Sequence, residues 1–563
     1  MQAAASRRVG IVLSGSTTRR FDFIVLEDAE DTVVEGKYVA AIAGGGVYLG
    51  VVEELSHVHE FYEEGEVWVE ALRKGRRPPE GVARRYLRAT ARIVGYVSGD
   101  TLQNPPRPPP PGATVSTVTG AELKPVYGFD PSGDPPDWAI VVGDLYGYTG
   151  SERLSAPLDL RAITMHMAVV GTTGSGKSNT MGVIIEELGR KTGVDVGIAR
   201  LPVTIPALIV DINGDYLDYY CNPDLVPSYW RVYRLVLENS RAYQSRGGTH
   251  VKQVLLPLHL DLDILEPHEL AEAIVVLYRR GPGEATAIQE SVLAEHLDKE
   301  YLEERLAITS YNELFSSKKL VGELISDILE KSRGRDAEIH AATARAVERQ
   351  LNTFYRSLSR NRLVSETPTV GGEFIDELTN PDEPGLAIVD FTIDGAPTGL
   401  DVKQFIVYYI SKLLYKKFVD YKMGESRSDR VILYVLEEAQ NFAPNLPVYQ
   451  IGFSIARSIL YTVATQGRKF GLSLAIVTQR PKYVDPVVLS MMNTFIIHRV
   501  PPADVGFVEQ VTGGLPGGLK ARLSTMEKGV AIIHGQMNPA PLPSVARVRK
   551  RDSHGVSEGG LHC

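Results

Sequence analysis

The sequence predicts an α/β fold with a parallel sheet at its centre, a small β-barrel ahead of it and a helical bundle inserted into it. Three observations lead to this prediction. Residues 1–100 contain short β-rich runs at regular spacing, residues 264–362 are almost wholly helical in pattern, and apolar strands alternate with helices on both sides of that helical block. Alternating strands and helices are typical of a mainly parallel sheet that is covered on both faces.

The composition fits a multidomain globular protein and limits its partners. The 563 residues are 44% hydrophobic and 23% charged, and a chain of this length contains about three or four domains. The 60 basic and 69 acidic residues leave a net charge of −9, so any nucleic-acid contact must be confined to a patch or a lined channel. With only Cys221 and Cys563, a disulfide framework and a cysteine-based zinc site are excluded, and a reducing compartment is expected.

Apolar runs in this chain are too short for a membrane span or a signal peptide. A span needs about 18 consecutive apolar residues. The run Val9–Leu13, which follows Arg7 and Arg8, is shorter than the roughly 7–15 residues of a signal-peptide core. We therefore expect a cytoplasmic protein without a membrane partner.

The barrel is expected within residues 1–100. Its β-rich runs are Val9–Leu13, Phe21–Leu26, Lys37–Ile42, Val47–Val52, Val67–Ala71 and Ala91–Val97. Glycine or charged residues separate the runs, as expected for short strands joined by turns, and evenly spaced short strands suggest a small barrel. The proline-rich stretch Asn104–Gly112 favours an extended connection, so we expect residues 101–153 to form a connecting strap.

The parallel-sheet core is expected in two pieces, residues 154–263 and 363–535, with the bundle between them. The expected strands are His166–Val170, Pro206–Val210, Leu386–Val389, Val431–Leu436 and Leu472–Val477, and the expected helices are Lys177–Arg190, Val402–Lys417 and Ile451–Gln466. Four bundle helices are expected over Leu265–Arg280, Thr286–Leu306, Tyr311–Lys331 and Asp336–Arg360. Residues 536–563 are expected to form a tail with the basic cluster Arg547–Arg551.

A phosphate-binding loop follows the strand that ends at Val170. The pattern G-x-x-x-x-G-K-[ST] is met by Gly171, Thr172, Thr173, Gly174, Ser175, Gly176, Lys177 and Ser178, with Asn179 next. Such glycines let backbone N–H groups and a helix N-terminus converge on an anion. Lys177 would neutralise the β- and γ-phosphates and Ser178 would complete a Mg²⁺ shell. A glycine-rich turn with an incidental lysine is the alternative, but the strand and helix around the loop favour nucleotide binding.

Two adjacent carboxylates, Glu437 and Glu438, end the strand Val431–Leu436. A carboxylate at this point can hold Mg²⁺, directly or through water, and a second can polarise the attacking water. We assign the metal role to Glu437 and the general-base role to Glu438. The longer side chain of Glu437, where Asp is more usual, favours contact with the metal through a water. The alternative is an acidic helix N-terminus.

Polar residues at two further loops complete the predicted site. Gln479 follows the strand Leu472–Val477 and would sense the γ-phosphate or the attacking water; an ordinary polar loop residue is the alternative. Arg468, between a helix and that strand, would enter a neighbouring subunit's site as an arginine finger, with Arg457 and Arg480 as rivals and a solvated helix-terminal cation as the alternative. Asp211 would touch the metal's water shell, order a switch loop, or form an Asx turn.

Together these motifs resemble the HerA branch of the HerA/FtsK hexameric DNA translocases. The residues that carry the resemblance are 166–180, 211–216, 437–444 and 467–481. Gln440 stands where the family often has His, Asp215 where Glu is common, and Met165 where Arg is frequent. The resemblance implies a RecA-like P-loop ATPase core, an N-terminal barrel of the HAS type, and an archaeal homo-hexamer that uses ATP and Mg²⁺ to move DNA in end resection of double-strand breaks. It also implies a NurA-type nuclease partner at the barrel face. An ordered tail in relatives favours a tail whose cluster Arg547–Arg551 braces a neighbouring subunit, and a disordered tail is the alternative.

The sequence also allows two other functions, and it leaves the role of one surface undecided. The chain is alternatively a peripheral motor ATPase of a secretion or conjugation system, or a nucleotide-gated scaffold that recruits a nuclease and for which Glu438 is dispensable. A run of arginines, Arg345, Arg349, Arg356 and Arg360, lies on the fourth expected bundle helix. Such a run is usually a solvated or ion-paired face, and a contact with DNA or a subunit is the minority interpretation.

Overall fold

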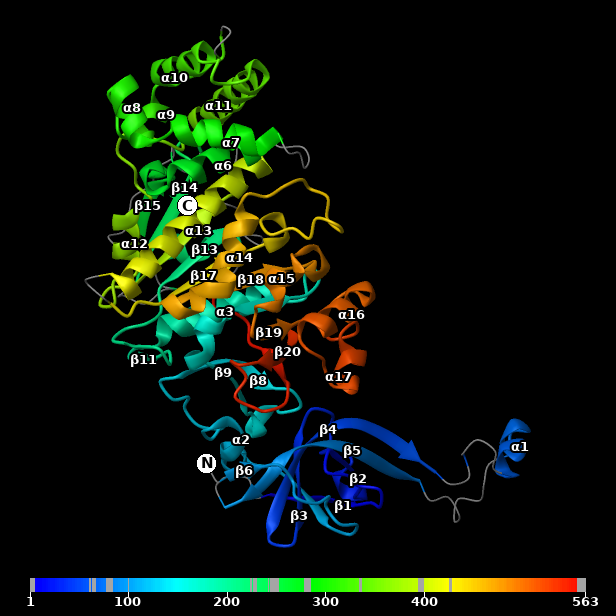
Figure 1. Ribbon diagram of the computed structural model, residues 1–563. Helices are drawn as coiled ribbons and strands as arrows, with labels where there is room; N and C mark the ends of the chain where they lie inside the picture. Colours follow the sequence, from blue (N-terminus) through cyan, green and yellow to red (C-terminus); the bar gives the residue numbers. More distant parts are fainter. Residues whose placement is uncertain are drawn as a thin grey trace. The chain divides into compact units, whose positions relative to one another are not determined.

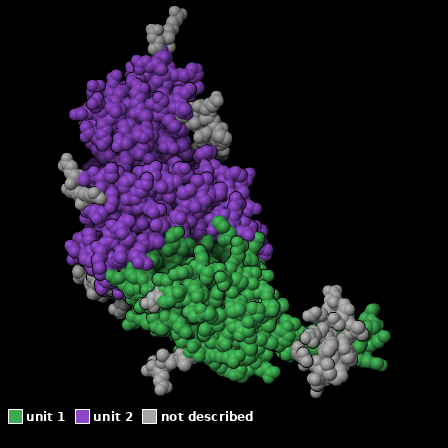
Figure 2. All heavy atoms as spheres, turned by 60° about the horizontal axis from the view of Figure 1, so that its bottom comes forward, with its two compact units in different colours: residues 1–159, 497–499, 513–549 green, residues 160–496, 500–512, 550–563 purple. Residues whose placement is uncertain are grey.

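The computed structural model describes residues 6–59, 62, 67–76, 85–99, 101–222, 225, 230–240, 243, 253–277, 285–333, 337–392, 399–424 and 428–553. The chain divides into two compact units (Figure 2). Unit 1 comprises residues 1–159, 497–499 and 513–549, and unit 2 comprises residues 160–496, 500–512 and 550–563. Within the described ranges, no helix combines the length and apolarity that crossing a bilayer requires.

Unit 1 contains the predicted barrel. Its strands are β1 (Arg8–Val12), β2 (Arg20–Val25), β3 (Tyr38–Ala43), β4 (Gly46–Val58), β5 (Tyr86–Ser98), β6 (Thr101–Gln103) and β7 (Thr114–Thr117). They pair in the order β2-β1-β7-β3-β4-β5-β6, and β2 also pairs with β5, so all but β6 form a closed ring. Phe21, Phe23 and Val115 are fully buried inside it. Closure removes the exposed edges that an open sheet would leave.

Two parts of the barrel differ from the sequence prediction. The run Val67–Ala71 is not a strand: it belongs to helix α1 (Val67–Arg73), because Glu70–Arg73 are strong helix formers that outweigh the β propensity of the preceding residues. Strand β7 lies inside the predicted strap of residues 101–153. The strand forms because Val115 is apolar and fills the barrel core, so the proline-rich stretch connects β6 to β7 of one barrel.

A second sheet of unit 1 is antiparallel. It contains β8 (Ala139–Leu145), β9 (Ser155–Asp159), β20 (Val530–Gly535) and β21 (Ser544–Val548), in the order β20-β21-β8-β9. The short helices α2 (Lys124–Tyr127) and α17 (Gly517–Arg522) also belong to this unit. Because β21 lies within residues 536–563, part of the predicted tail is a strand of this sheet. Among the described residues of the tail, Lys550–Ser553 belong to unit 2 and the others belong to unit 1.

Unit 2 contains the predicted α/β core (Figure 1). The strands are β10 (Met167–Val170), β13 (Ala207–Asp211), β14 (Arg231–Val236), β15 (Gln253–Pro257), β16 (Gly385–Asp390), β17 (Ile432–Leu436), β18 (Leu472–Thr478) and β19 (Thr494–Ile497). Their order is β15-β14-β16-β13-β17-β18-β10-β19, and all pairs from β15 to β10 are parallel. Every residue of β13, β16 and β17 is buried, as expected for a parallel sheet with helices on both faces. The α/β prediction is confirmed, although β14, β15 and β19 were not predicted.

The helical block contains more and shorter helices than the four predicted. They are α6 (Pro267–Val276), α7 (Ala285–His296), α8 (Lys299–Leu306), α9 (Tyr311–Ser316), α10 (Lys318–Glu330) and α11 (Ala341–Asn361). Two expected helices are split because Asp298 and Ser317 each accept backbone N–H bonds and so start a new helix. Figure 1 shows the block beyond the edge of the sheet where β14 and β15 lie. The expected breaks at residues 281–283 and 334 lie outside the described residues.

Candidate nucleotide site

The phosphate-binding loop lies at the carboxyl end of β10 and leads into α3 (Lys177–Arg190). Gly174 and Gly176 have φ of 72° and 120°, a region that favours glycine because a Cβ atom would clash with the backbone. Ser175 Oγ donates to the Thr172 carbonyl at 2.7 Å and closes the turn. Gly176 makes no side-chain cap for α3, so the first N–H groups of the helix are available to an anion.

Lys177 is buried in this loop and is surrounded by carboxylates. Its Nζ donates to the Thr172 carbonyl at 3.1 Å. Burial lowers the pKa of Lys177, while the negative charges of Glu438, Glu437 and Asp215 act in the opposite direction. The sheet order explains the convergence, because the carboxyl ends of parallel strands meet at one edge. Lys177, the predicted metal residue Glu437 and the predicted general base Glu438 therefore belong to one site.

Asp211 organises the loop that follows β13. Its Oδ1 accepts backbone N–H bonds from Asn213 at 3.1 Å, Gly214 at 2.8 Å and Asp215 at 3.2 Å, and its Oδ2 accepts one from Tyr216 at 2.9 Å. Of the three roles that the sequence left open, the hydrogen bonds favour the Asx-type turn, which here orders an entire loop. A carboxylate bound by several N–H groups is fixed in place and holds the loop against the site.

Glu437 fits the predicted metal role. Its carboxylate is buried at the end of β17, and the Tyr216 hydroxyl donates to its Oε1. Mg²⁺ in phosphate sites usually takes one or two protein oxygens, together with phosphate oxygens and waters. Ser178 at the start of α3 and Glu437 would supply such oxygens. The described residues contain no group of three or more His, Cys, Asp or Glu that could hold a metal without a nucleotide.

Two side-chain hydrogen bonds in series connect Glu438 to the neighbouring strand β18. Its backbone is left-handed, with φ of 50°, a conformation that residues other than glycine adopt mainly at turns and functional sites. Gln440 Nε2 donates to Glu438 Oε2, and Thr478 Oγ1 donates to Gln440 Oε1 at 2.7 Å. The amide of Gln440 therefore links the predicted general base to the end of β18.

Gln479 contacts the phosphate-binding loop directly. Thr173 Oγ1 donates to Gln479 Oε1, and the Thr173 side chain is exposed on the loop. Since β18 lies beside β10 in parallel, the residue after β18 is brought next to the first residues of the loop. This position suits the sensing role that we predicted from the sequence.

Arg468 lies at the other end of the same strands. It belongs to the 3-10 turn Gly467–Phe470, which precedes β18, whereas Gln479 follows β18. Seven residues of strand span about 23 Å, so the Arg468 guanidinium cannot reach the loop of its own chain. Arg468 is exposed, and no carboxylate of the described chain pairs with it. Its rival Arg457 is held by Asp485, with Nε to Oδ2 at 2.6 Å.

The chain is similar to several known proteins. Residues 140–414 match the family described as "Helicase HerA, central domain". Residues 140–414 are thus similar to a HerA central domain. The DNA double-strand break repair helicase HerA of Sulfurisphaera tokodaii is 22% identical over 550 residues, covering 96% of this chain and 93% of the relative. The helicase of the same name from Pyrococcus furiosus is 25% identical over 503 residues, covering 82% and 77%. The solved bacterial conjugative coupling protein TrwB is 13% identical, with a TM-score of 0.48 over 78% of this chain and 93% of that one.

The end of the described chain packs on the phosphate-loop helix. The backbone N–H of Arg551 donates to Asn179 Oδ1 at 3.0 Å, and its Nη1 donates to the Asp215 carbonyl at 2.6 Å. The N–H of Asp552 donates to Glu186 Oε1 at 2.9 Å. Sequence reasoning assigned Asn179 to the nucleotide, but it missed the partner Arg551. Bracing of a neighbouring subunit by the tail stays a prediction.

The buried carboxyls of the nucleotide site predict a pH-dependent stability. Burial raises the pKa of Glu437 to about 8, and that of Asp211 to about 7, with nearby negative charges adding to both. Because each folded pKa exceeds its ordinary value, the folded protein keeps protons that the unfolded chain loses. Stability from these groups is complete below about pH 4 and is lost as the pH rises toward 8, by about 1.4 kcal/mol per pH unit for each proton.

Glu437→Gln, which imitates the protonated side chain, is therefore expected to become more stable relative to the natural protein as the pH rises from 5 to 8. Thermal unfolding without nucleotide or metal measures this difference at each pH. The exposed Glu366 offers the matched control, because Glu366→Gln changes the same charge without desolvation. A constant difference between Glu437→Gln and the natural protein over this range would contradict a protonated Glu437.

Proposed function

We propose that this protein is an ATP-driven, ring-forming DNA translocase of the helicase type. The observation that carries the proposal is the division of the site. The phosphate-binding loop, Glu437, Glu438 and Gln479 converge at the carboxyl edge of the sheet around Lys177, whereas Arg468 is exposed at the amino edge. A chain that holds the nucleotide at one edge and an arginine at the other is suited to subunits arranged head to tail, and such contacts form a ring when they close.

Each site residue has one role in the proposed reaction. The N–H groups of the loop and Lys177 hold the triphosphate, Ser178 and Glu437 hold the Mg²⁺, and Glu438 accepts a proton from the attacking water. Gln479 orients that water or the γ-phosphate. Mg²⁺, when bound, supplies charge neutralisation at the phosphates. Arg468 from the adjacent subunit stabilises the charge that develops on the transferred phosphoryl group.

The biological setting is proposed from the relatives. Both curated relatives named above are DNA double-strand break repair helicases, and the similarity to the first extends over nearly the whole chain. We propose that this chain likewise acts as a homo-hexamer at DNA ends, with a nuclease of the NurA type docked at the barrel face. The cytoplasmic location expected from the sequence stays a prediction.

The proposal predicts that DNA accelerates ATP hydrolysis. Steady-state release of phosphate is measured with no DNA, with a duplex and with a single strand, at low and high salt. We expect a rise of about tenfold or more with DNA at low salt and its loss at high salt, because contacts to phosphates weaken as salt competes. A turnover rate that is the same without DNA, with a duplex and with a single strand would refute a DNA motor.

A further inference from the structure

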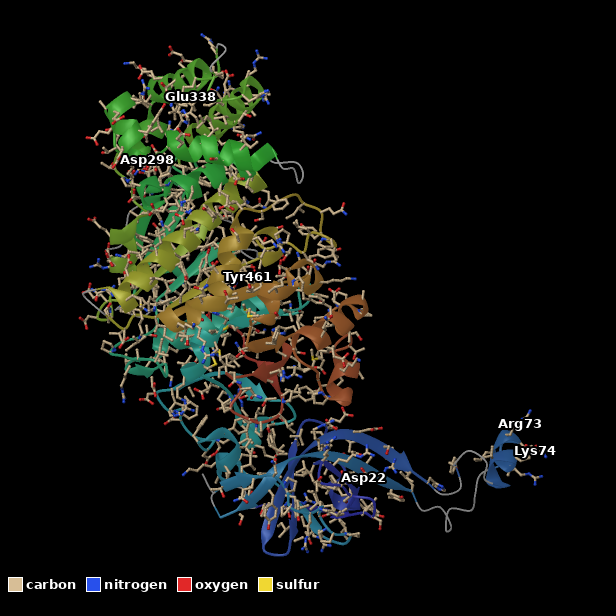
Figure 3. The ribbon with its side chains drawn as sticks, viewed as in Figure 1. Asp22, Arg73, Lys74, Asp298, Glu338 and Tyr461 are labelled. Atoms are coloured by element: carbon tan, nitrogen blue, oxygen red, sulfur yellow. The ribbon has the colours of Figure 1, made fainter. Side chains whose placement is uncertain are left out.

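Helix α11 exposes four arginines on one side. Arg345, Arg349, Arg356 and Arg360 are all exposed. At about 100° per residue they fall within about 60° of the helix circumference, and at about 1.5 Å per residue they extend along about 22 Å of its length. We call these four residues the arginine stripe. Figure 3 draws the side chains of this bundle and labels Glu338, on the segment that leads into α11.

The opposite side of α11 fixes the orientation of the stripe. Val347, Leu351, Phe354 and Leu358 are buried. The ring of Phe354 lies 5.2 Å from that of Phe315 and 5.3 Å from that of Phe405, both edge to face. These contacts join the helix to the bundle and to α13 (Leu400–Met423). The arginines therefore lie on a rigid helix. Binding to them does not carry the entropy cost of ordering a flexible segment.

The described residues provide no ion-pair partner for the stripe. No carboxylate in the described part of the chain forms an ion pair with any of its four guanidinium groups, although elsewhere in unit 2 the partly exposed Arg231 pairs with Glu377 at 2.6 Å. The residues between the arginines are small or uncharged, and Glu348 borders this face three residues after Arg345: the small or uncharged residues are Ala341, Ala342, Asn352, Thr353 and Ser359. The ion-paired interpretation of this run does not apply, and the face carries concentrated positive charge on a chain of net charge −9.

We propose that the arginine stripe binds the phosphate backbone of DNA during translocation, an inference that rests on the proposed function. Guanidinium groups bind phosphate oxygens in pairs, and the small residues between them let a backbone approach closely. Among the described residues of α11, no exposed aromatic or long aliphatic side chain lies on this face as an anchor, whereas the centres of protein interfaces are enriched in aromatic residues as well as arginine. A long cationic face without such an anchor fits a uniformly charged polymer, and its contacts would be independent of base sequence.

The test compares two double variants that each remove two charges from the bundle. Arg349→Gln with Arg356→Gln changes the stripe, and Lys318→Gln with Lys319→Gln changes exposed lysines of α10 outside it. Fluorescence anisotropy gives the affinity of the full-length ring for a labelled duplex over a series of KCl concentrations. We expect the stripe variant to bind at least about tenfold more weakly at low salt, with a salt slope reduced by about 1–2, because each lost phosphate contact removes about 0.9. The lysine variant should match the natural protein.

Three further readouts separate the outcomes. Arg349→Lys with Arg356→Lys keeps the charge and should retain most of the slope, and DNA-free ATP hydrolysis should stay unchanged in all variants. Unchanged affinity and slope in the glutamine variant would overturn the inference while leaving the DNA motor intact. Dissociation of the ring by the glutamine changes would assign the stripe to a subunit contact and overturn it too. If the natural protein itself binds no DNA, the proposed function fails, and the inference fails with it.

Discussion

Glu438→Gln is expected to reduce ATP hydrolysis by at least about a hundredfold while the protein still binds ATP, since a positioned general base contributes about 10²–10⁴ to a rate. Glutamine nearly preserves the shape of glutamate, so the hydrogen bond from Gln440 to this side chain is disturbed less than by truncation. The negative charge and the ability to accept a proton are lost. The turnover rate and the affinity for a fluorescent ATP analogue, measured on the same preparation, separate the two effects.

Two variants serve as controls for that result. Lys177→Ala removes a charge that faces the phosphates and should weaken ATP binding itself, unlike Glu438→Gln. Gln440→Ala leaves the carboxylate of Glu438 but removes its link to Thr478, so we expect a smaller loss of turnover than with Glu438→Gln. If DNA handling and nuclease recruitment survive complete loss of hydrolysis, the nucleotide-gated scaffold replaces the motor as the best interpretation.

The parts of the site that the sequence predicted are those encoded by contiguous residues. The phosphate-binding loop is one eight-residue motif, and Glu437 and Glu438 directly follow an apolar run. Such local patterns fix the chemistry and the strand that carries it. Parallel strand order then places the ends of β10, β17 and β18 at one edge, which explains why Thr173 meets Gln479 across more than 300 residues of sequence.

The partners that orient the site were not predictable because they depend on tertiary contacts. Nothing in the sequence around Tyr216 shows that its hydroxyl reaches Glu437, and Thr478 gives no local sign of its bond to Gln440. The buried pair between Arg234 and Asp390, with Nη2 to Oδ2 at 2.8 Å, was missed together with strand β14. In the bundle, a cap such as Asp298 decides where one long helical pattern becomes two helices.

Arg468→Ala is expected to lower ATP hydrolysis by about a thousandfold without preventing ring formation, because an arginine finger contributes about 10³–10⁵ to the rate. The exposed neighbour Lys469 provides the control. Lys469→Ala removes a charge from the same turn but leaves Arg468 in place, so this variant should retain activity. Turnover is measured together with particle size by light scattering. Arg457→Ala is expected to act differently, because it breaks the pair with Asp485 and so lowers thermal stability as well.

Mixing experiments decide between action within a chain and action across an interface. Arg468→Ala subunits keep Lys177, and Lys177→Ala subunits keep Arg468. A mixed ring therefore contains interfaces at which an intact loop from the first kind meets an intact arginine from the second. Because the length of β18 separates the two residues within one chain, an active site can form only at such interfaces. Two inactive preparations should therefore regain turnover when their subunits exchange. The gain should be largest when the two kinds of subunit are mixed in nearly equal proportions. If every mixture stays inactive although subunits exchange, Arg468 does not complete the neighbour's site, and the head-to-tail arrangement loses its chemical basis.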